Sequence, residues 1–370
     1  MVEYAKYELK NVCSRLSSGK SISSKMISEE GRYPVYGGNG LRGYTDHSNF
    51  SGDCAIIGRQ GAFCGNVRYF SGEAYMTEHA VVVCANNLNN THYLAYLLST
   101  MNLGRLSGQS AQPGLSVKTL GIQEIMLPSI EYQNKVVALL SSLDEKIAVN
   151  NNINDNLYAQ AKEIFAQRFI GIETIPDGWK KGNLLDIANY LNGLAMQKFR
   201  PRDDEVGLPV LKIKELRQGS CDVSSELCSP SIKPEYIVHD GDVIFSWSGS
   251  LLVDIWCGGT CGLNQHLFKV TSETYDQWFY YLWTAHHLER FIAIAADKAT
   301  TMGHIKREEL EKAEVLIPSE KDYKEISSLM NPLFNLIIAN RIEARKLAEL
   351  RDELLPKLMS GEIDVSEVSV

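Results

Sequence analysis

A heptad pattern of apolar residues occurs twice in this chain, at an offset of about 190 residues. The apolar positions alternate at spacings of three and four over about four heptads, which is typical of a helix that packs on another helix along a narrow stripe. The positions are Val136, Leu140, Leu143, Ile147, Asn150, Asn154, Leu157, Ala161 and Ile164 in the first copy, and Ile326, Met330, Leu333, Ile337, Asn340, Ala344, Leu347, Arg351 and Leu354 in the second. The sequence therefore predicts two long, matched helices.

The segments before each helix also repeat. The matched pairs are residues 33–36 with 208–211, Gly52 and Asp53 with Gly241 and Asp242, residues 78–80 with 265–267, and residues 127–129 with 317–319. The offset grows from about 175 to about 190 along the chain, so the second globule contains an insertion. We predict an internal pseudo-twofold repeat in the order globule, helix, globule, helix, with boundaries at 1–130, 131–175, 176–318 and 319–370.

The predicted fold class is α+β, with two mixed α/β globules joined by two long helices that form an antiparallel coiled coil. Short β-rich runs lie between glycine-rich turns, and an aromatic helix is expected from about Tyr275 to Ala295. The first long helix is expected from Tyr132 to Phe169. Pro332 and Pro356 predict a kink or a broken start in the second.

The seam asparagines allow two interpretations. A buried polar residue in a helix seam fixes register at a cost in stability, which Asn150 and Asn340 would do together. Alternatively, the seam is partly exposed at this point, and polar residues cost little there.

Composition limits the class of protein. The formal net charge of -8 argues against an isolated DNA-binding protein, so a chain that reads nucleic acid would act beside a more basic partner. No apolar run reaches the roughly 20 residues that span a bilayer, and the first residues lack a signal-peptide pattern, so we expect a soluble, cytoplasmic protein without a membrane partner. The eight cysteines form no CxxC pair, which favours free thiols over a metal site.

Several short motifs in this order resemble a known family, the specificity (S) subunit of type I restriction-modification systems. They are residues 176–179 (PDGW), 58–61 (GRQG), 127–129 and 317–319 before the two helices, 143–147 (LDEKI) with Asn150, and the closing 358–363 (LMSGEI). The resemblance covers essentially the whole chain.

The resemblance implies a function without chemistry of its own. Each globule would be a target recognition domain that reads one half of a bipartite site in double-stranded DNA. The helices would space the halves and dock two methyltransferase (M) subunits, which restriction-translocase (R) subunits join. The chain itself would hold no cofactor, and S-adenosylmethionine, ATP and magnesium would belong to the partners.

Candidate DNA contacts are basic and polar residues next to glycine-rich loops, since arginine and lysine reach phosphates and guanine edges. They are Lys20, Lys25, Arg42, Arg59, Gln60 and Arg68 in the first globule, and Lys198, Arg200, Lys212, Lys214, Arg217 and Ser248 in the second. For any single member, a solvated surface charge is the competing interpretation. Arg59 has no arginine counterpart, because residues 58–61 align with Trp247 to Ser250.

Two other functional classes stay open. A stand-alone DNA methyltransferase or nuclease would need a catalytic motif, but residues 331–334 (NPLF) lie on the helix seam and residues 14–21 lack the first glycine of a phosphate-binding loop. A non-DNA scaffold built on a coiled coil would fit the acidic charge. His79 and His266 stand at equivalent places, where a structural role is favoured over DNA contact or catalysis because no acid or nucleophile recurs with them.

Overall fold

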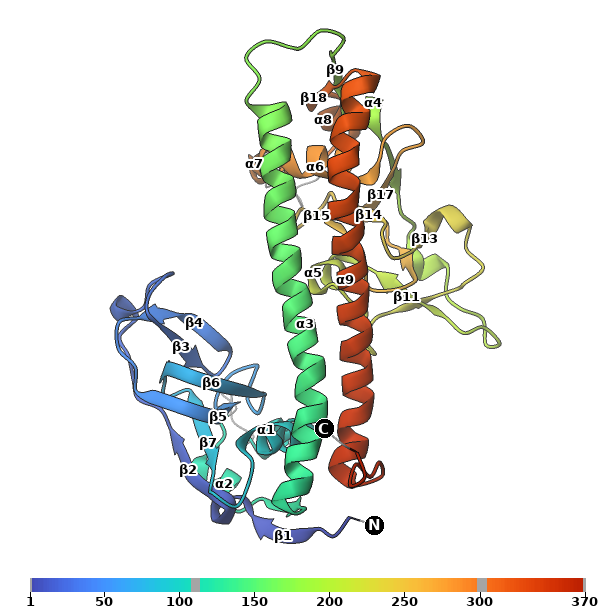
Figure 1. The fold of residues 1–370 in the computed structure, drawn as a ribbon. Helices are drawn as coiled ribbons and strands as arrows, with labels where there is room; N and C mark the ends of the chain where they lie inside the picture. Colours follow the sequence, from blue (N-terminus) through green and yellow to red (C-terminus); the bar gives the residue numbers. More distant parts are fainter. Residues whose placement is uncertain (1, 108–113, 298–304, 369–370) are drawn as a thin grey trace. The chain divides into compact units, whose positions relative to one another are not determined.

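Two long helices run through this computed structural model, which describes residues 2–107, 114–297 and 305–368 (Figure 1). Helix α3 extends from Ile130 to Phe165 and is followed by a π-helical turn, Ala166–Ile170. Helix α9 extends from Glu320 to Ser360 without interruption. The expectation of a broken start in the second helix is therefore wrong. Each proline removes only one backbone donor, and buried residues on both sides of Pro332, Met330 and Phe334, hold the helix in place.

The chain divides into two compact units, and each contains one globule with segments of both long helices. The first unit comprises Met1–Glu145 and Ala348–Val370, and the second comprises Lys146–Leu347.

The first unit is built on a six-stranded sheet with the order β2-β7-β5-β6-β3-β4. Its strands are β2 (Cys13–Ser18), β3 (Tyr33–Gly37), β4 (Gly40–Thr45), β5 (Phe50–Gly58), β6 (Val67–Met76) and β7 (Ala80–Ala85), and a separate ribbon pairs β1 (Ala5–Glu8) with β8 (Glu124–Leu127). Helices α1 (Thr91–Thr100) and α2 (Val117–Gly121) complete the unit, with 3-10 turns at Leu9–Val12, Ser24–Met26 and Leu103–Leu106. The side chain of Asn90 caps α1 by accepting from the backbone N–H groups of His92 and Tyr93.

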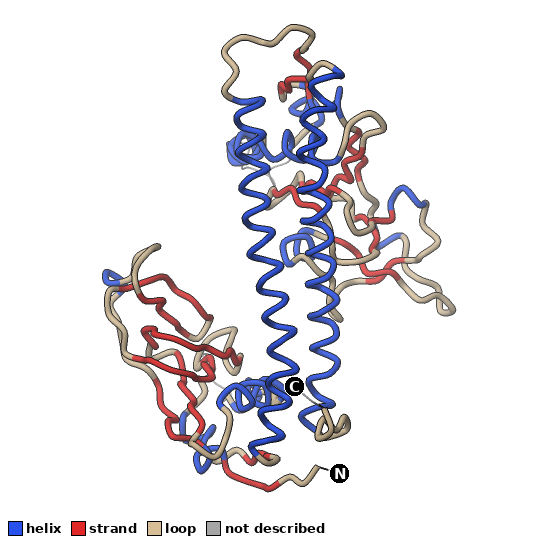
Figure 2. Tube along the Cα trace, in the orientation of Figure 1, coloured by secondary structure: helices blue, strands red, loops and turns tan. Residues whose placement is uncertain are grey.

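The second unit contains two four-stranded sheets, with the orders β10-β17-β14-β15 and β12-β11-β16-β13, and the ribbon β18-β9 (Figure 2). The strands are β9 (Lys180–Asn183), β10 (Asn189–Asn192), β11 (Leu208–Leu211), β12 (Leu227–Cys228), β13 (Ile237–Val238), β14 (Val243–Ser246), β15 (Leu252–Ile255), β16 (Cys261–Leu263), β17 (Leu267–Thr271) and β18 (Glu314–Ile317). The helices are α4 (Leu184–Ile187), α5 (Ile213–Gln218), α6 (Gln277–His286), α7 (Leu288–Asp297) and α8 (Arg307–Glu311), with 3-10 turns at Met196–Lys198 and Pro234–Tyr236. The aromatic helix expected over 275–295 is thus two helices, α6 and α7. They meet at His287, whose ring nitrogen Nε2 lies 2.8 Å from the carbonyl oxygen of Glu314.

The strand pairing confirms the internal repeat. The order β2-β7-β5-β6 in the first unit corresponds to β10-β17-β14-β15 in the second. Strand β3 pairs in parallel with the end of β6, and β11 pairs in parallel with β16 in the same way. The ribbon β1-β8 likewise corresponds to β9-β18. Two globules of one fold, each followed by a long helix, confirm the α+β architecture that the sequence predicts.

Each unit has its own apolar core, and the long helices contribute to both. In the first unit, α1 and the sheet bury Tyr93, Leu94 and Val83 against Val136 and Leu140 of α3. In the second unit, the aromatic residues of α6 pack with Phe165 and Phe169 and with the α9 residues Ile326, Met330 and Phe334. The seam positions Val136, Leu140, Ala161, Ile326 and Met330 are thus buried in these cores.

In the second unit, α3 and α9 pack in opposite directions through buried amides. Asn340 Nδ2 donates to Asn154 Oδ1 over 3.0 Å, and Asn154 Nδ2 donates to the carbonyl oxygen of Ile337 over 3.2 Å. Asn150 Nδ2 donates to Glu343 over 2.7 Å. Asn150, Asn154 and Asn340 are 1%, 8% and 9% exposed, so the interpretation of a partly exposed seam is wrong.

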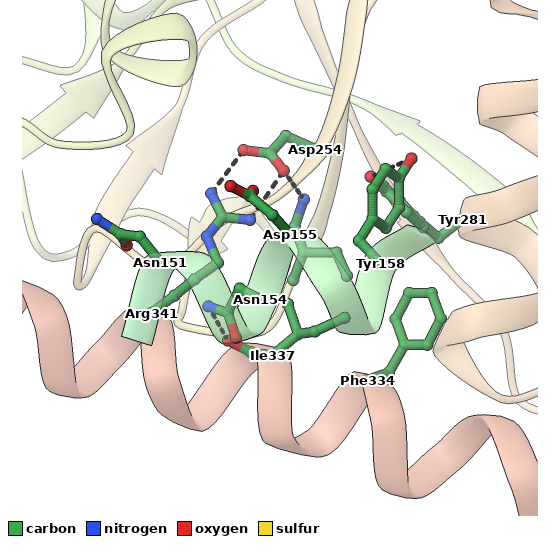
Figure 3. A pocket seen from close by; sticks show the side chains of 10 residues that line it. Asn151, Asn154, Asp155, Tyr158, Asp254, Tyr281, Phe334, Ile337 and Arg341 are labelled. Atoms are coloured by element: carbon green, nitrogen blue, oxygen red, sulfur yellow. Dashed lines mark hydrogen bonds and ion pairs between the residues drawn. The ribbon is translucent and has the colours of Figure 1, made fainter. Parts of the chain in front are cut away.

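A cavity of about 290 Å³ lies beside this seam, within the second unit (Figure 3). It is lined by Asn151, Asn154, Asp155, Tyr158, Asp254, Ile255, Tyr281, Phe334, Ile337 and Arg341. Arg341 of α9 reaches Asp254 of β15 through two hydrogen bonds, and the hydroxyl group of Tyr281 donates to that of Tyr158 over 3.3 Å. Among the described residues, none of the helices has the length and apolar character needed to cross a bilayer.

Candidate nucleic-acid interface

In the first globule, most of the predicted contacts gather around the glycine-rich turn between β3 and β4. A Cβ built on Gly37 would lie 2.7 Å from Arg42 Cδ, and one on Gly40 would lie 3.0 Å from Arg68 Cζ. Arg42, Gln60 and Arg68 are exposed. Because Gly37 and Gly40 leave this space empty, the two guanidinium side chains can lie against the turn.

Arg59 and Gln60 lie beside the same turn, whereas Lys20 lies at the turn between β6 and β7. A Cβ built on Gly38 would lie 3.4 Å from the carbonyl oxygen of Gln60 and 3.6 Å from Arg59 N. Lys20 N donates to the carbonyl oxygen of Met76, just before the turn that leads into β7. The guanidinium of Arg59 is half-buried, with Nη1 donating to Ser18 Oγ and to the carbonyl oxygen of Glu78, both at 3.4 Å.

Lys25 is separate from this cluster. It lies in the exposed 3-10 turn Ser24–Met26, next to the segment in which Ser28 pairs with Tyr44 of β4. The structure thus gathers Arg42, Arg59, Gln60 and Arg68 around one turn, with Lys20 at the turn between β6 and β7 and Lys25 on the neighbouring strand edge.

In the second globule, three predicted residues line one hollow of about 460 Å³. Arg200, Lys212 and Lys214 share it with residues that the sequence did not single out as contacts, and the full lining is Gln197, Arg200, Lys212, Ile213, Lys214, Glu226, Asn264, Gln265 and His266. The hollow therefore combines cationic side chains with amide and imidazole groups, which is the combination that contacts phosphates and base edges.

Acidic side chains hold the cations of this hollow in place. Glu226 lies 3.1 Å from Arg200 and 2.5 Å from Lys212, and Lys214 lies 3.4 Å from Asp222. The hydrogen bond and charge of Lys212, with a smaller effect of Arg200, lower the pKa of the Glu226 carboxyl group. The cations are thus oriented in the free protein, and a phosphate group would compete with Glu226 for them.

The other predicted residues of the second globule lie outside the hollow. Lys198 is exposed in the turn Met196–Lys198, and Arg217 is exposed on α5. Ser248 is only 3% exposed, and its Oγ lies 3.1 Å from His266 Nδ1. It therefore supports His266 within the loop and does not itself form part of the surface.

His79 and His266 are not among the predicted DNA contacts, but the structure places both beside them. His79 Nδ1 lies 3.0 Å from Gln60 Oε1, so it joins the cluster of the first globule, and His266 lines the hollow of the second. Both have hydrogen-bond partners, as a structural role requires, yet both also lie among the predicted contacts. The sequence showed that the two histidines recur at equivalent places, but it did not show that the loops at 58–61 and 247–250 bring them next to the predicted contacts.

The motifs considered for catalysis lie in structural elements. Residues 331–334 are inside α9, where Phe334 packs on Tyr281 with ring centroids 5.7 Å apart. Residues 13–18 form β2, so the segment that resembles a phosphate-binding loop begins as a strand. Within the described ranges, no group of three or more His, Cys, Asp or Glu side chains is placed to hold a metal ion.

Comparison with known proteins identifies a family model and several relatives. The model, described as the type I restriction modification DNA specificity domain, matches residues 1–159 and 176–351. The EcoprrI type I restriction enzyme specificity subunit of Escherichia coli is 41% identical over 134 residues, which cover 35% of this chain and 33% of that protein. The MjaIX specificity subunit of Methanocaldococcus jannaschii is 29% identical over 307 residues, covering 75% of this chain and 70% of that protein.

One solved structure shares the fold. The crystal structure of a type I restriction-modification system S subunit from M. genitalium matches with a TM-score of 0.63, over 96% of each chain and at 15% sequence identity. The aligned region spans only a third of the EcoprrI subunit, although it spans 70% of the MjaIX subunit.

Proposed function

Because this chain belongs to the type I restriction-modification DNA specificity family, we propose that it is the sequence-reading and scaffolding subunit of a type I complex. Each globule reads one half of a bipartite site in double-stranded DNA. The observation that carries this proposal is the repetition of one sheet with a polar loop cluster at the same edge: Arg42, Arg59 and Arg68 in the first globule, and Arg200 and Lys212 in the second.

The two clusters differ in the way that two different half-sites would require. The first presents guanidinium groups around a glycine turn, whereas the second presents amides and an imidazole among ion-paired cations. Phosphate contacts would give each globule its position on the duplex, and the polar side chains would read base edges.

The long helices are proposed to space the two globules and to dock two methyltransferase subunits, with restriction-translocase subunits joining that core. Apolar side chains exposed on the second unit's helix segments support a docking role: Val149 and Ile153 on α3 are 49% and 39% exposed, and Leu329 and Leu336 on α9 are 48% and 46% exposed. A more basic partner would also offset the net charge of -8 when DNA binds.

The chain is proposed to perform no chemistry itself. S-adenosylmethionine, ATP and magnesium would be bound by the partner subunits. Purified protein without partners, mixed with DNA and either S-adenosylmethionine or magnesium, is expected to show no turnover. Methylation or cleavage by the chain alone would contradict this part of the proposal and would favour a stand-alone enzyme.

The spacing role is tested by deleting one heptad from α3 and the matching heptad from α9, within the complex with its methyltransferase. Seven residues of helix rise about 10.5 Å, so the gap between the half-sites is expected to shorten by about three base pairs. Both half-sites should keep their bases in methylome sequencing. Altered half-site bases with an unchanged gap would overturn the mechanism.

A further inference from the structure

A turn of four residues recurs at the same edge of the two sheets, with a histidine at its third position. The turns are Thr77–Ala80 before β7 and Asn264–Leu267 before β17. The backbone N–H of the last residue donates to the carbonyl oxygen of the first over 3.0 Å in both turns. The side-chain oxygen of the first residue also accepts from the histidine N–H, at 3.4 Å in the first turn and 3.2 Å in the second.

The imidazole rings make the same two kinds of contact. Nδ1 faces the loop that follows the neighbouring strand, lying 3.0 Å from Gln60 Oε1 in the first globule and 3.1 Å from Ser248 Oγ in the second. Nε2 faces the residue just before the histidine, at 3.4 Å from Glu78 Oε1 and at 3.3 Å from Gln265 Nε2. The histidine thus holds the preceding side chain in both turns, and that side chain differs between them.

Gln265 has hydrogen-bonding capacity left over for a ligand. It lines the hollow formed with Arg200, Lys212 and Lys214. One amide proton is directed at His266, which leaves the second N–H and the carbonyl oxygen. A donor and an acceptor on one amide match N7 and N6 of adenine in the major groove.

Glu78 presents a carboxylate oxygen instead. Its side chain is 39% exposed, and Oε2 is buried without a hydrogen-bond partner among the described residues, so Oε1, which faces His79, is the oxygen left for a base. A carboxylate in a base-reading position accepts a proton from N4 of cytosine. The guanidinium of Arg59, which lies 3.4 Å from the carbonyl oxygen of Glu78, would offset the repulsion between this carboxylate and the DNA phosphates.

We propose that the residue before the histidine in each turn reads one base pair: Gln265 an adenine in the second half-site, and Glu78 a cytosine in the first. His266 and His79 are positioning residues that orient these side chains. The inference rests on the proposed function and adds to it the specificity-determining positions and the bases they select.

The test exchanges the two side chains in the complex with the methyltransferase subunit and measures base preference on a library of randomised double-stranded DNA. Glu78→Gln is expected to change one preferred pair of the first half-site from C·G to A·T, and Gln265→Glu is expected to make the reverse change in the second. Gln265→Ala should reduce discrimination at that pair by about 5- to 150-fold. In each variant, the untouched half-site reports on folding and assembly.

Matched controls make the same chemical changes elsewhere. Glu73→Gln alters an exposed residue of β6, and Gln167→Glu alters an exposed residue of the turn after α3 that does not line the hollow, so both should leave the half-sites unchanged. His266→Ala should relax the same base pair as Gln265→Ala, whereas a merely structural role would weaken every position of the half-site.

The outcomes separate this inference from the proposed function. A wild-type complex without sequence preference would overturn the proposed function itself. A selective wild-type complex whose half-sites are the same in Glu78→Gln and Gln265→Glu would overturn the inference alone, as would half-sites that lack the predicted cytosine or adenine.

Discussion

Replacing Arg341 by methionine is expected to destabilise the second unit by about 2–3 kcal/mol, because it leaves Asp254 without its cation. The guanidinium donates to both carboxylate oxygens, over 2.9 and 2.7 Å, and so ties α9 to β15 beside the cavity at the seam (Figure 3). Burial alone would lower the pKa of Arg341, but the hydrogen bonds and charge of Asp254 raise it. The interaction with Asp254 therefore outweighs the desolvation of the guanidinium group.

The size of the expected loss of stability follows from the partial exposure of the Arg341 and Asp254 side chains. The two side chains are 28% and 27% exposed. Breaking a fully buried pair costs about 3–5 kcal/mol, whereas a fully exposed pair contributes about 0–1 kcal/mol. The geometry is bidentate and both side chains are mostly buried. We therefore expect the loss of stability in Arg341→Met to lie close to the range for a fully buried pair. Arg341→Met should cost more than Asp254→Asn, since the amide still accepts one hydrogen bond from the guanidinium.

Differential scanning calorimetry of the full chain measures the effect through a double-mutant cycle of Arg341→Met and Asp254→Asn. For a unit of this size, each 1 kcal/mol lowers the melting temperature by about 2–4 °C, so Arg341→Met should lower it by about 4–12 °C. The double variant should cost less than the sum of the singles. Lys324→Met, which removes an exposed ion pair within one turn of α9, serves as the control and should leave the melting temperature unchanged. Additive single effects, or a loss no larger than in the control, would refute the reasoning.

Three further predictions concern other parts of the molecule. Asn340→Leu should lower the free energy of unfolding by about 1–3 kcal/mol, because it leaves the buried Asn154 oxygen without its donor. Calorimetry should show that the double variant with Asn154→Leu recovers much of this stability. A double variant that loses as much stability as the two single variants together would contradict the prediction. Burial lowers the pKa of His92, so at acidic pH the unfolded chain binds a proton that the folded chain does not. The melting temperature should therefore fall as the pH drops below about 6.5, and it should fall less steeply in His92→Phe. Equal slopes in the two proteins would contradict this role of His92. A hydrogen bond from Cys261 lowers the pKa of Cys221, whereas burial raises the pKa of Cys257 to about 11. Peptide mass spectrometry after brief iodoacetamide treatment should therefore find Cys221 alkylated before Cys257, and equal alkylation of the two would contradict this.

Much of the fold could be predicted because its signals are local. Heptad spacing predicted the first long helix to within a few residues and the presence of the second, and the recurrence of residues 33–36 at 208–211 identified strands that pair in the same way in both globules. The break expected at Pro332 does not occur, because packing on both sides of the proline outweighs the loss of one helical hydrogen bond. The division between α6 and α7 also escaped prediction, because it involves a contact from His287 to Glu314, which is distant in sequence.

The candidate site was less predictable, because its members come together only through tertiary contacts. The sequence offered Arg200, Lys212 and Lys214 as basic residues, but their shared hollow depends on a turn that follows β16, about 50 residues later in the chain. In the sequence, Gln265 could be recognised only as a member of the repeated segment at residues 265–267. Its relation to Arg200 needed the register of β17 against β10 and β14, which no local pattern specifies.

The amide contact between Asn154 and Asn340 joins two positions that the repeat does not relate to each other. Under the repeat, Asn154 corresponds to Ala344 and Asn340 corresponds to Asn150. The mirrored contact would place Asn150 against the methyl group of Ala344, which cannot form a hydrogen bond, and Asn150 donates to Glu343 instead. A helix pair made from two copies of the first sequence would carry the amide contact twice, and one made from two copies of the second would lack it. A single contact therefore gives the helix pair a polarity, so that its two ends are chemically distinct although both follow one pattern.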